Sequence, residues 1–313
     1  MSLNVVFMGT PDFAVTTLKA IQQSNHQVVG VVTNIDKPAG RGKRLHESAV
    51  KQYAVAQELP LLQPEKLKDP EFLATLKAWK ADVFIVVAFR MLPKEVWQIP
   101  SKGTINLHAS LLPNYRGAAP INWAIIHRER VSGVSTFFID EEIDTGKLLL
   151  QKSIDLEEDE TAGSLHDKLA NLGGQLLEET LDALAVGIDA KAQQLQGSEH
   201  AAPKLNRENT RIDWSKSLEE IDAFVRGLSP YPVAWTILEE EGGEKVMKLF
   251  EVKTEYTEHQ HPPLAVLVEN KALKIAHPQG YVHCLSLQLP NKRRLATKDL
   301  LNGYQFSPAA RVK

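Results

Sequence analysis

Three polar side chains near the middle of the chain are of types that can stabilise and relay charge: Asn106, His108 and Asp144. Residues 104–108 have the alternating, β-branched character of a short strand, so Asn106 and His108 share one face of it. Pro113 cannot donate to a sheet, and the strand must end before it. Both side chains are therefore expected near the carboxyl end of a strand, which borders the ligand crevice in open parallel α/β sheets.

Asp144 follows a strand pattern at 133–139 and directly precedes Thr145 and Gly146, which predicts a turn. The Asn106 amide and the His108 ring can donate hydrogen bonds to an oxygen that gains negative charge, an interaction worth about 3–4 kcal/mol per donor. Asp144 could orient the His108 ring, favour its protonated form and relay protons through water. The three residues lack the ligand spacing of a zinc site, so no metal is expected.

The elements that must position these residues read as an α/β scaffold. A strand pattern at 4–9, a helix pattern to about residue 24 and a strand at 27–33 form a β-α-β opening, which implies a parallel sheet. Helices are expected at 48–58 and 70–79, and a core strand at 82–88. Residues 134–139 and 147–154 are expected to pair as a hairpin that places Asp144 at its turn. A long amphipathic helix at 161–185 closes this domain.

The second half of the chain changes in character. Small and polar residues dominate from 186 to about 207, which is typical of a linker. A helix pattern at 218–226 is followed by short alternating runs, which favour a small β-barrel. We therefore predict a catalytic domain at 1–188, a linker at 189–207 and a C-terminal barrel domain at 208–313.

Composition excludes several classes of protein. With 313 residues, 43% hydrophobic and 24% charged, the chain resembles ordinary soluble proteins. Its single cysteine, Cys284, cannot form an internal disulfide and is too isolated to be assigned as a nucleophile. The longest apolar run, 83–89, is too short to span a bilayer, and no signal peptide is visible. A cytoplasmic location without a membrane partner is expected.

Two basic clusters stand out against a formal net charge of −3. One is the glycine-rich segment 34–46, which carries Lys37, Arg41, Lys43 and Arg44 and is longer than most strand-to-helix connections. The other lies near the C-terminus and includes Lys292, Arg293 and Arg294. Each cluster alone could be solvated surface, and the first could be a disordered loop without a role. Two clusters in separate domains favour contact with a phosphate backbone.

The motifs together resemble the folate-dependent formyltransferases. The family pattern Asn-x-His-x-Ser-Leu-Leu-Pro-x-Tyr-x-Gly is intact at 106–117, and Asp-x-Gly is intact at 144–146. Gly-Thr-Pro-Asp-Phe-Ala at 9–14, Gly-Lys-Arg-Leu at 42–45 and Ile-Asp-Trp at 212–214 match the tRNA-directed members, and the similarity covers nearly the whole chain. The resemblance implies a Rossmann-like formyltransferase domain, followed by an OB-like barrel that binds tRNA.

The resemblance also implies the reaction. The formyl group of 10-formyltetrahydrofolate would pass to the free amino group of initiator methionyl-tRNA, for translation initiation, with no DNA partner. Asn106 and His108 would stabilise the tetrahedral intermediate while Asp144 orients the histidine. An α-amino group titrates at about 7.7–8, and an ester lowers that value, so little general-base help is required.

The remaining site residues follow from the same resemblance. The folate site would comprise Phe89, Arg90, Met91, Leu92, Ser110, Leu111, Leu112, Pro113, Ile139 and Asp140. The tRNA contacts would comprise Arg41, Lys43, Arg44, Lys292, Arg293 and Arg294. Segment 89–92 could equally be a plain strand-to-helix turn, and Leu111 and Leu112 could be simple core.

Other functions would use the same residues. A formyltransferase that acts on an amino sugar, or a formyl-folate hydrolase, needs the same Asn, His and Asp with a different acceptor. From another class, the chain could be an RNA-binding module with a vestigial fold, which the intact catalytic set disfavours. Formyl transfer assayed against different acceptors separates these alternatives.

Overall fold

The structure is a computed structural model that describes residues 1–39 and 44–313. The chain divides into two compact units. The first unit comprises Met1–Gly117, Val131–Asp155 and His166–Ala201, and the second comprises Ala118–Arg130, Leu156–Leu165 and Ala202–Lys313. Because the chain passes between the units several times, no single boundary separates them. The domain limits at residues 188 and 207 remain a prediction.

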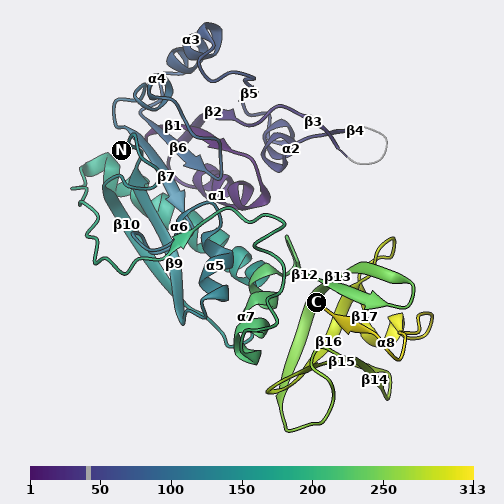
Figure 1. Ribbon diagram of the computed structural model, residues 1–313. Helices are drawn as coiled ribbons and strands as arrows, with labels where there is room; N and C mark the ends of the chain where they lie inside the picture. Colours follow the sequence, from purple (N-terminus) through teal and green to yellow (C-terminus); the bar gives the residue numbers. More distant parts are fainter. Residues whose placement is uncertain (40–43) are drawn as a thin grey trace. The chain divides into compact units, whose positions relative to one another are not determined.

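A seven-stranded mixed sheet forms the centre of the first unit, in the order β10-β9-β7-β6-β1-β2-β5 (Figure 1). Its strands are β1 (Asn4–Gly9), β2 (Gln27–Val32), β5 (Leu61–Leu62), β6 (Val83–Val87), β7 (Thr104–His108), β9 (Val131–Phe138) and β10 (Leu148–Asp155). Five neighbouring strands of this sheet run parallel to one another, namely β7, β6, β1, β2 and β5. β9 runs antiparallel to β7, and β10 runs antiparallel to β9. The predicted Rossmann-like domain is confirmed, with the expected hairpin added at one edge.

Helices cover both faces of this sheet. They are α1 (Asp12–Gln23), α2 (Ala49–Ala56), α3 (Pro70–Ala78), α4 (Lys94–Trp97) and α6 (Ala162–Val186). Leu107 of β7 lies against Gly173 of α6, where an added Cβ would come within 2.7 Å of the leucine side chain. Side chains alternate along a strand, so Asn106 and His108 lie on the opposite face. Asn106 pairs in register with Val86, which packs in a cluster with residues of α3.

The segment after β2 is not irregular throughout, contrary to the expectation of one long loop. β3 (Lys37–Ala39) and β4 (Arg44–His46) pair as an antiparallel hairpin. The predicted contacts Arg41 and Lys43, and the side chain of Arg44, lie outside the described residues. Because β2 and β7 are parallel within one sheet, their carboxyl ends lie on the same side of the sheet. The hairpin leaves β2 at that side, and His108 lies there at the end of β7.

A second antiparallel sheet forms the core of the second unit, in the order β14-β15-β16-β13-β12-β18. Its strands are β12 (Ala234–Glu240), β13 (Gly243–Tyr256), β14 (Val266–Glu269), β15 (Ala272–His277), β16 (Gly280–Gln288) and β18 (Arg311–Val312), and β17 (Leu295–Ala296) pairs with β16. An antiparallel bridge between Ala265 and Arg311 joins the two ends. The sheet is therefore a nearly closed barrel, as the short alternating runs predict.

Three helices and two short strands complete the chain: α5 (Pro120–Ile126), α7 (Leu218–Leu228), α8 (Thr297–Leu300), β8 (Arg116–Gly117) and β11 (Ala201–Ala202). α7 begins with a capping box, in which Ser217 and Glu220 satisfy each other's backbone N–H groups. Cys284 lies in the barrel core at 2% exposure, where burial raises the pKa of its thiol to about 12. It is therefore a packing residue. No helix among the described residues is long and apolar enough to cross a membrane.

Candidate active site

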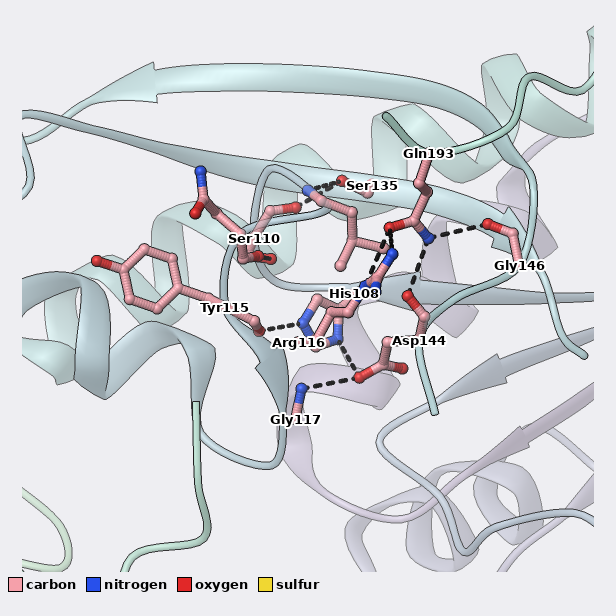
Figure 2. A network of polar contacts seen from close by, with 11 residues as sticks. His108, Ser110, Tyr115, Arg116, Gly117, Ser135, Asp144, Gly146 and Gln193 are labelled. Atoms are coloured by element: carbon pink, nitrogen blue, oxygen red, sulfur yellow. Dashed lines mark hydrogen bonds and ion pairs between the residues drawn. The ribbon is translucent and has the colours of Figure 1, made fainter. Parts of the chain in front are cut away.

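His108 is the last residue of β7 and is only 6% exposed. Its Nε2 lies 2.8 Å from the carbonyl oxygen of Tyr115 (Figure 2). A carbonyl only accepts hydrogen bonds, so Nε2 carries a proton and donates it to Tyr115. The other ring nitrogen, Nδ1, lies 3.7 Å from Oδ2 of Asp144. Nδ1 is therefore the nitrogen that faces the carboxylate.

Asp144 lies in the turn between β9 and β10, with its side chain 14% exposed. Its Oδ2 accepts a hydrogen bond of 2.9 Å from the Gly117 N–H. The 3.7 Å separation from His108 is longer than an N–H···O hydrogen bond, so no direct hydrogen bond joins the Asp144 carboxylate to the ring. In this geometry the hydrogen bond that orients the ring is the one that Nε2 donates to the Tyr115 carbonyl.

The backbone is unusual both in the loop that follows His108 and in the turn that carries Asp144. Tyr115 and Asp144 both have left-handed backbone, with φ of 60° and 57°, which costs a non-glycine residue about 1–2 kcal/mol. Gly117 has φ of 125°, a value that side chains rarely permit. A Cβ on Gly146 would lie 1.7 Å from the Phe138 carbonyl oxygen. The two motif glycines are thus required by backbone geometry on either side of Asp144.

Asn106 lies two residues before His108 and is partly buried. Among the described residues, its side-chain amide has no hydrogen-bond partner. The amide therefore remains available to an oxygen that binds beside it. This is the property that the sequence motif requires of an oxyanion donor.

The loop after His108 is fastened to the neighbouring hairpin. Ser135 of β9 donates through Oγ to the Ser110 carbonyl at 2.6 Å and accepts from the Leu112 N–H at 3.0 Å. Gln151 of β10 donates to the Leu112 carbonyl at 2.9 Å. Leu111 packs over Gly133, and Leu112 is 3% exposed. Packing within the protein accounts for both leucines, and their contact with folate stays a prediction, as do contacts of Ser110 and Pro113.

Several other residues predicted for the folate site lie together. Phe89, Leu92 and Ile139 pack in the cluster that contains Val86, the register partner of Asn106. Their side chains therefore lie on the same face of the sheet as Asn106 and His108. Asp140 instead accepts hydrogen bonds within its own turn, from the Glu142 N–H and from Thr145 Oγ1.

Arg90 and Met91 differ from that cluster. Arg90 donates to the carbonyls of Pro64 and Glu65, whereas its Nε is buried and has no partner in the described part of the chain. Burial lowers the pKa of the Arg90 guanidinium. Met91 is 70% exposed. An unpaired buried donor beside exposed apolar surface fits a polar ligand that binds against this turn.

Three contributors to the site are not among the site residues predicted from the sequence. Tyr115 holds His108, and Arg116 donates through Nε to Oε1 of Gln193 at 3.1 Å. Gln193 donates in turn to the carbonyls of Asp144 and Gly146, both at 2.9 Å. Tyr115 and Arg116 belong to the recognised motif, but nothing in the polar segment around Gln193 distinguishes it in the sequence.

The C-terminal basic residues lie in the second unit. Lys292, Arg293 and Arg294 are all exposed. Arg294 donates through Nε to Ser286 at 2.9 Å and lies 4.6 Å over the Phe250 ring, which holds its side chain in place. A basic surface with ordered side chains suits contact with phosphates. In the described part of the chain, no group of three or more His, Cys, Asp or Glu side chains could hold a metal.

Comparison with protein families agrees with this layout. Residues 3–181 match the family described as formyl transferase, and residues 204–305 match formyl transferase, C-terminal domain. The methionyl-tRNA formyltransferase of Flavobacterium johnsoniae is 51% identical over 311 residues, or 99% of each chain. The methionyl-tRNA formyltransferase of Bacteroides thetaiotaomicron is 50% identical over 311 residues, or 97% of each chain.

Solved structures share the fold at low identity. HypX from Aquifex aeolicus in complex with tetrahydrofolic acid is 19% identical with a TM-score of 0.64, covering 96% of this chain. The match covers 47% of HypX, so this chain spans about half the length of that protein. An N-formyltransferase from Helicobacter canadensis, in complex with folinic acid and dTDP-3-aminofucose, is 18% identical with a TM-score of 0.60, covering 91% of this chain and 99% of its own.

Proposed function

The chain belongs to the formyl transferase family, and on that premise we propose that it transfers the formyl group of 10-formyltetrahydrofolate to the amino group of initiator methionyl-tRNA. The observation that carries the proposal is its similarity to a methionyl-tRNA formyltransferase over 99% of both chains. The matched region contains both the C-terminal barrel and the candidate catalytic residues. The product would be formylmethionyl-tRNA for translation initiation.

The proposed chemistry starts at the end of β7. When the amine attacks the formyl carbon, the carbonyl oxygen gains negative charge that must be stabilised. Asn106 has an uncommitted amide beside His108, so its N–H groups can donate to that oxygen. A doubly protonated His108 would add positive charge at the same strand end. We assign oxyanion stabilisation to these two residues.

Asp144 would support His108 through charge. The Nε2 proton is held by Tyr115, so a second proton would reside on Nδ1, facing Asp144 at 3.7 Å. The carboxylate would then offset the positive ring, while the Gly117 N–H keeps the carboxylate in position. The gap is too long for a direct hydrogen bond, which suits proton exchange through a bridging water.

The folate donor supplies a formyl carbon on a nitrogen that leaves with a proton. The residues present fit an aromatic ligand with polar edges. Phe89 and Ile139 provide partly buried apolar surface beside the buried Leu92 on the catalytic face, and the Arg90 Nε is a buried donor without a partner among the described residues. We propose that this turn holds the donor. Ser110–Pro113 and Asp140 would contribute mainly by shaping the adjacent loops.

The acceptor would be held by positive charge. We propose that Lys292, Arg293 and Arg294 contact tRNA phosphates, and that Arg41, Lys43 and Arg44, in the stretch of sequence between β2 and α2, act as a second contact. Such contacts position the tRNA without reading its sequence. A bidentate contact from Arg41 to a base edge would add discrimination.

The test is a transfer assay with the purified chain and 10-formyltetrahydrofolate. We offer methionyl-tRNA, a nucleotide-linked amino sugar, or no acceptor, and follow the formylated product and free formate. Transfer to methionyl-tRNA alone is the expected result. Preferential transfer to the sugar, or formate release without an acceptor, would assign the same site to one of the alternative reactions. Binding of tRNA without turnover of the donor would point to an RNA-binding module.

A further inference from the structure

One glutamine spans the two loops that hold the candidate catalytic pair. The Gln193 amide donates through Nε2 to the carbonyls of Asp144 and Gly146, and its Oε1 accepts from Nε and Nη2 of Arg116 (Figure 2). A side-chain amide has two N–H donors and two acceptor positions. Gln193 therefore uses its full hydrogen-bonding capacity on these loops.

Each of those loops controls one side of the pair. On one side, Tyr115 accepts from His108, and Gly117 donates to Asp144. Arg116 is the residue between them. On the other side, Gln193 holds the carbonyl of Asp144 itself. Gln193 thus links the loop that orients the imidazole to the turn that presents the carboxylate, alongside the direct bond from Gly117 to Asp144.

The backbone of both loops needs such support. Tyr115 and Asp144 adopt left-handed conformations, which persist only where surrounding contacts hold them. The segment that carries Gln193 is itself attached nearby, because Lys191 pairs with Leu148 and the Tyr115 N–H donates to the His200 carbonyl. The loops are therefore held by a segment that comes from after α6.

Gln193 does not behave as a residue of the hydrophobic core. Lys191, Ala192 and Gln194 are exposed, and Gln193 is half-buried against polar partners. Replacing it should leave the sheet and the helices intact. A change in catalysis would then reflect the position of the loops rather than loss of the fold.

We propose that Gln193 is a positioning residue for formyl transfer, which keeps the Asp144 carboxylate at its working distance from His108. This inference rests on the proposed function. It assigns a catalytic contribution to a segment whose composition reads as a linker. Gln193 would act through Asp144 and Arg116, without contact to either substrate.

The experiment compares Gln193→Leu and Gln193→Glu with the neighbouring exposed control Gln194→Leu. Leucine has a similar size but no hydrogen bonds, whereas glutamate keeps an acceptor for Arg116 and loses both donors to the Asp144 turn. We expect both Gln193 variants to lose about tenfold to a hundredfold in kcat. The KM values for donor and tRNA should stay unchanged, and Gln194→Leu should match the wild type. All three should melt within a few degrees of the wild type.

A double-mutant cycle tests the route of the effect. In an Asp144→Ala background, Gln193→Leu should cause little further loss, because the group that it positions is gone. The proposal would be overturned if the double variant lost kcat by the product of the factors lost in Gln193→Leu and in Asp144→Ala. A KM change with normal kcat, wild-type activity in Gln193→Glu, or an unfolded Gln193→Leu would also contradict it.

The same assays separate this inference from the function on which it rests. A wild-type chain that forms no formylmethionyl-tRNA would overturn both. Full activity in Asp144→Ala would overturn the role of Asp144, and with it that of Gln193, while formyl transfer itself stands. An active wild type with an impaired Asp144→Ala and a normal Gln193→Leu would overturn the role of Gln193 alone.

Discussion

At the scale of single residues, the two ring nitrogens of His108 have different tasks. Nε2 is committed to the Tyr115 carbonyl at 2.8 Å, and this bond fixes the plane of the ring. Nδ1 faces Asp144 at 3.7 Å without a direct hydrogen bond. Among the described residues, the ring nitrogen left without a direct hydrogen bond is thus the one beside the carboxylate. Asn106, two residues earlier, has an amide without a partner among the described residues.

The charge of Asp144 can be separated from its hydrogen bond. Asp144→Asn keeps an oxygen that can accept from Gly117 but removes the negative charge, whereas Asp144→Ala removes both. We expect both variants to lose about 10²-fold or more in kcat, since the charge supports the histidine. Steady-state kinetics with methionyl-tRNA, and tRNA binding measured by filter retention, provide the two readouts. Wild-type turnover in Asp144→Asn would show that the hydrogen bond alone matters.

Asn106→Ala tests the oxyanion donor. Loss of one such donor should lower kcat by about 10²–10³-fold while tRNA affinity stays nearly constant. Asn106→Asp serves as a matched variant, because it keeps the size of the side chain but replaces the N–H groups with oxygen. Equal losses of affinity and turnover would assign Asn106 to substrate binding instead.

At the scale of elements, the β9–β10 turn depends on a close approach of two backbone segments. The Gly146 Cα lies so near the Phe138 carbonyl that a Cβ would come within 1.7 Å of its oxygen. The obstructing atom belongs to the backbone and cannot rotate away. The glycine of the Asp-x-Gly motif is therefore needed for the packing of the turn that carries Asp144.

Gly146→Ala should therefore displace the turn. We expect a loss of about 1–3 kcal/mol in stability from overpacking, and a fall in kcat of about a hundredfold from the shifted carboxylate. Gly242→Ala is the control, because nothing lies within 4 Å of its added Cβ. Thermal melts and transfer kinetics of both variants provide the comparison. A fully active Gly146→Ala would mean that the turn can shift without moving Asp144.

The end of β12 holds a second polar network, within the barrel. Glu240 is 6% exposed and accepts from Lys245 Nζ at 2.9 Å, from the Ser307 N–H at 3.0 Å and from the Tyr304 hydroxyl. Burial alone would raise the pKa of Glu240, but these donors outweigh it and lower the pKa below its usual 4.5. The ionised form is thus favoured in the folded barrel.

A lowered folded pKa makes this stabilisation dependent on pH. It is fully present above the unfolded value near 4.5 and is lost as the pH falls through the folded value. At pH 7 we expect Glu240→Gln to be less stable than the wild type by about 1–3 kcal/mol. The difference should shrink below about pH 4. Melting temperatures of both proteins between pH 7 and pH 3.5 check this, and a constant difference would refute the role of the charge.

At the scale of the whole molecule, the chain is built from two units that each have their own sheet and core. The first unit contains all three candidate catalytic residues, and the second contains the exposed cluster Lys292, Arg293 and Arg294. The proposed roles therefore place the chemical step in the first unit and one of the two proposed tRNA contacts in the second. Substitutions in the barrel should alter the use of tRNA without altering the chemical step.

Charge neutralisation in the barrel tests that separation. Lys292→Gln and Arg293→Gln should raise the KM for tRNA and leave kcat unchanged. The slope of log kcat/KM against log salt should fall by about one for each phosphate contact that is lost. The same measurement on Arg41→Ala tests the hairpin after β2. Unchanged salt dependence in the barrel variants would remove that cluster from the tRNA contacts.

Much of this protein follows from local sequence. The strand at 104–108, the hairpin that presents Asp144 and the barrel strands all follow from periodicity and turn chemistry, which are local properties of the chain. The residue types at Asn106, His108 and Asp144 indicate the chemistry because few side chains can donate to an oxyanion and carry protons. The fold class and the family are therefore predictable before any coordinates exist.

Tertiary structure decided the contacts between distant segments. The sequence predicts that Asp144 orients His108, whereas the hydrogen bond made by the ring in the structure is donated to the Tyr115 carbonyl. Gln193 joins Arg116 to the Asp144 turn although 77 and 49 positions separate it from these partners. The reason is physical. Periodicity shows which face of an element is buried, but which hydrogen-bonding groups meet depends on how loops cross in space, and a lone glutamine in a polar segment leaves no local signal.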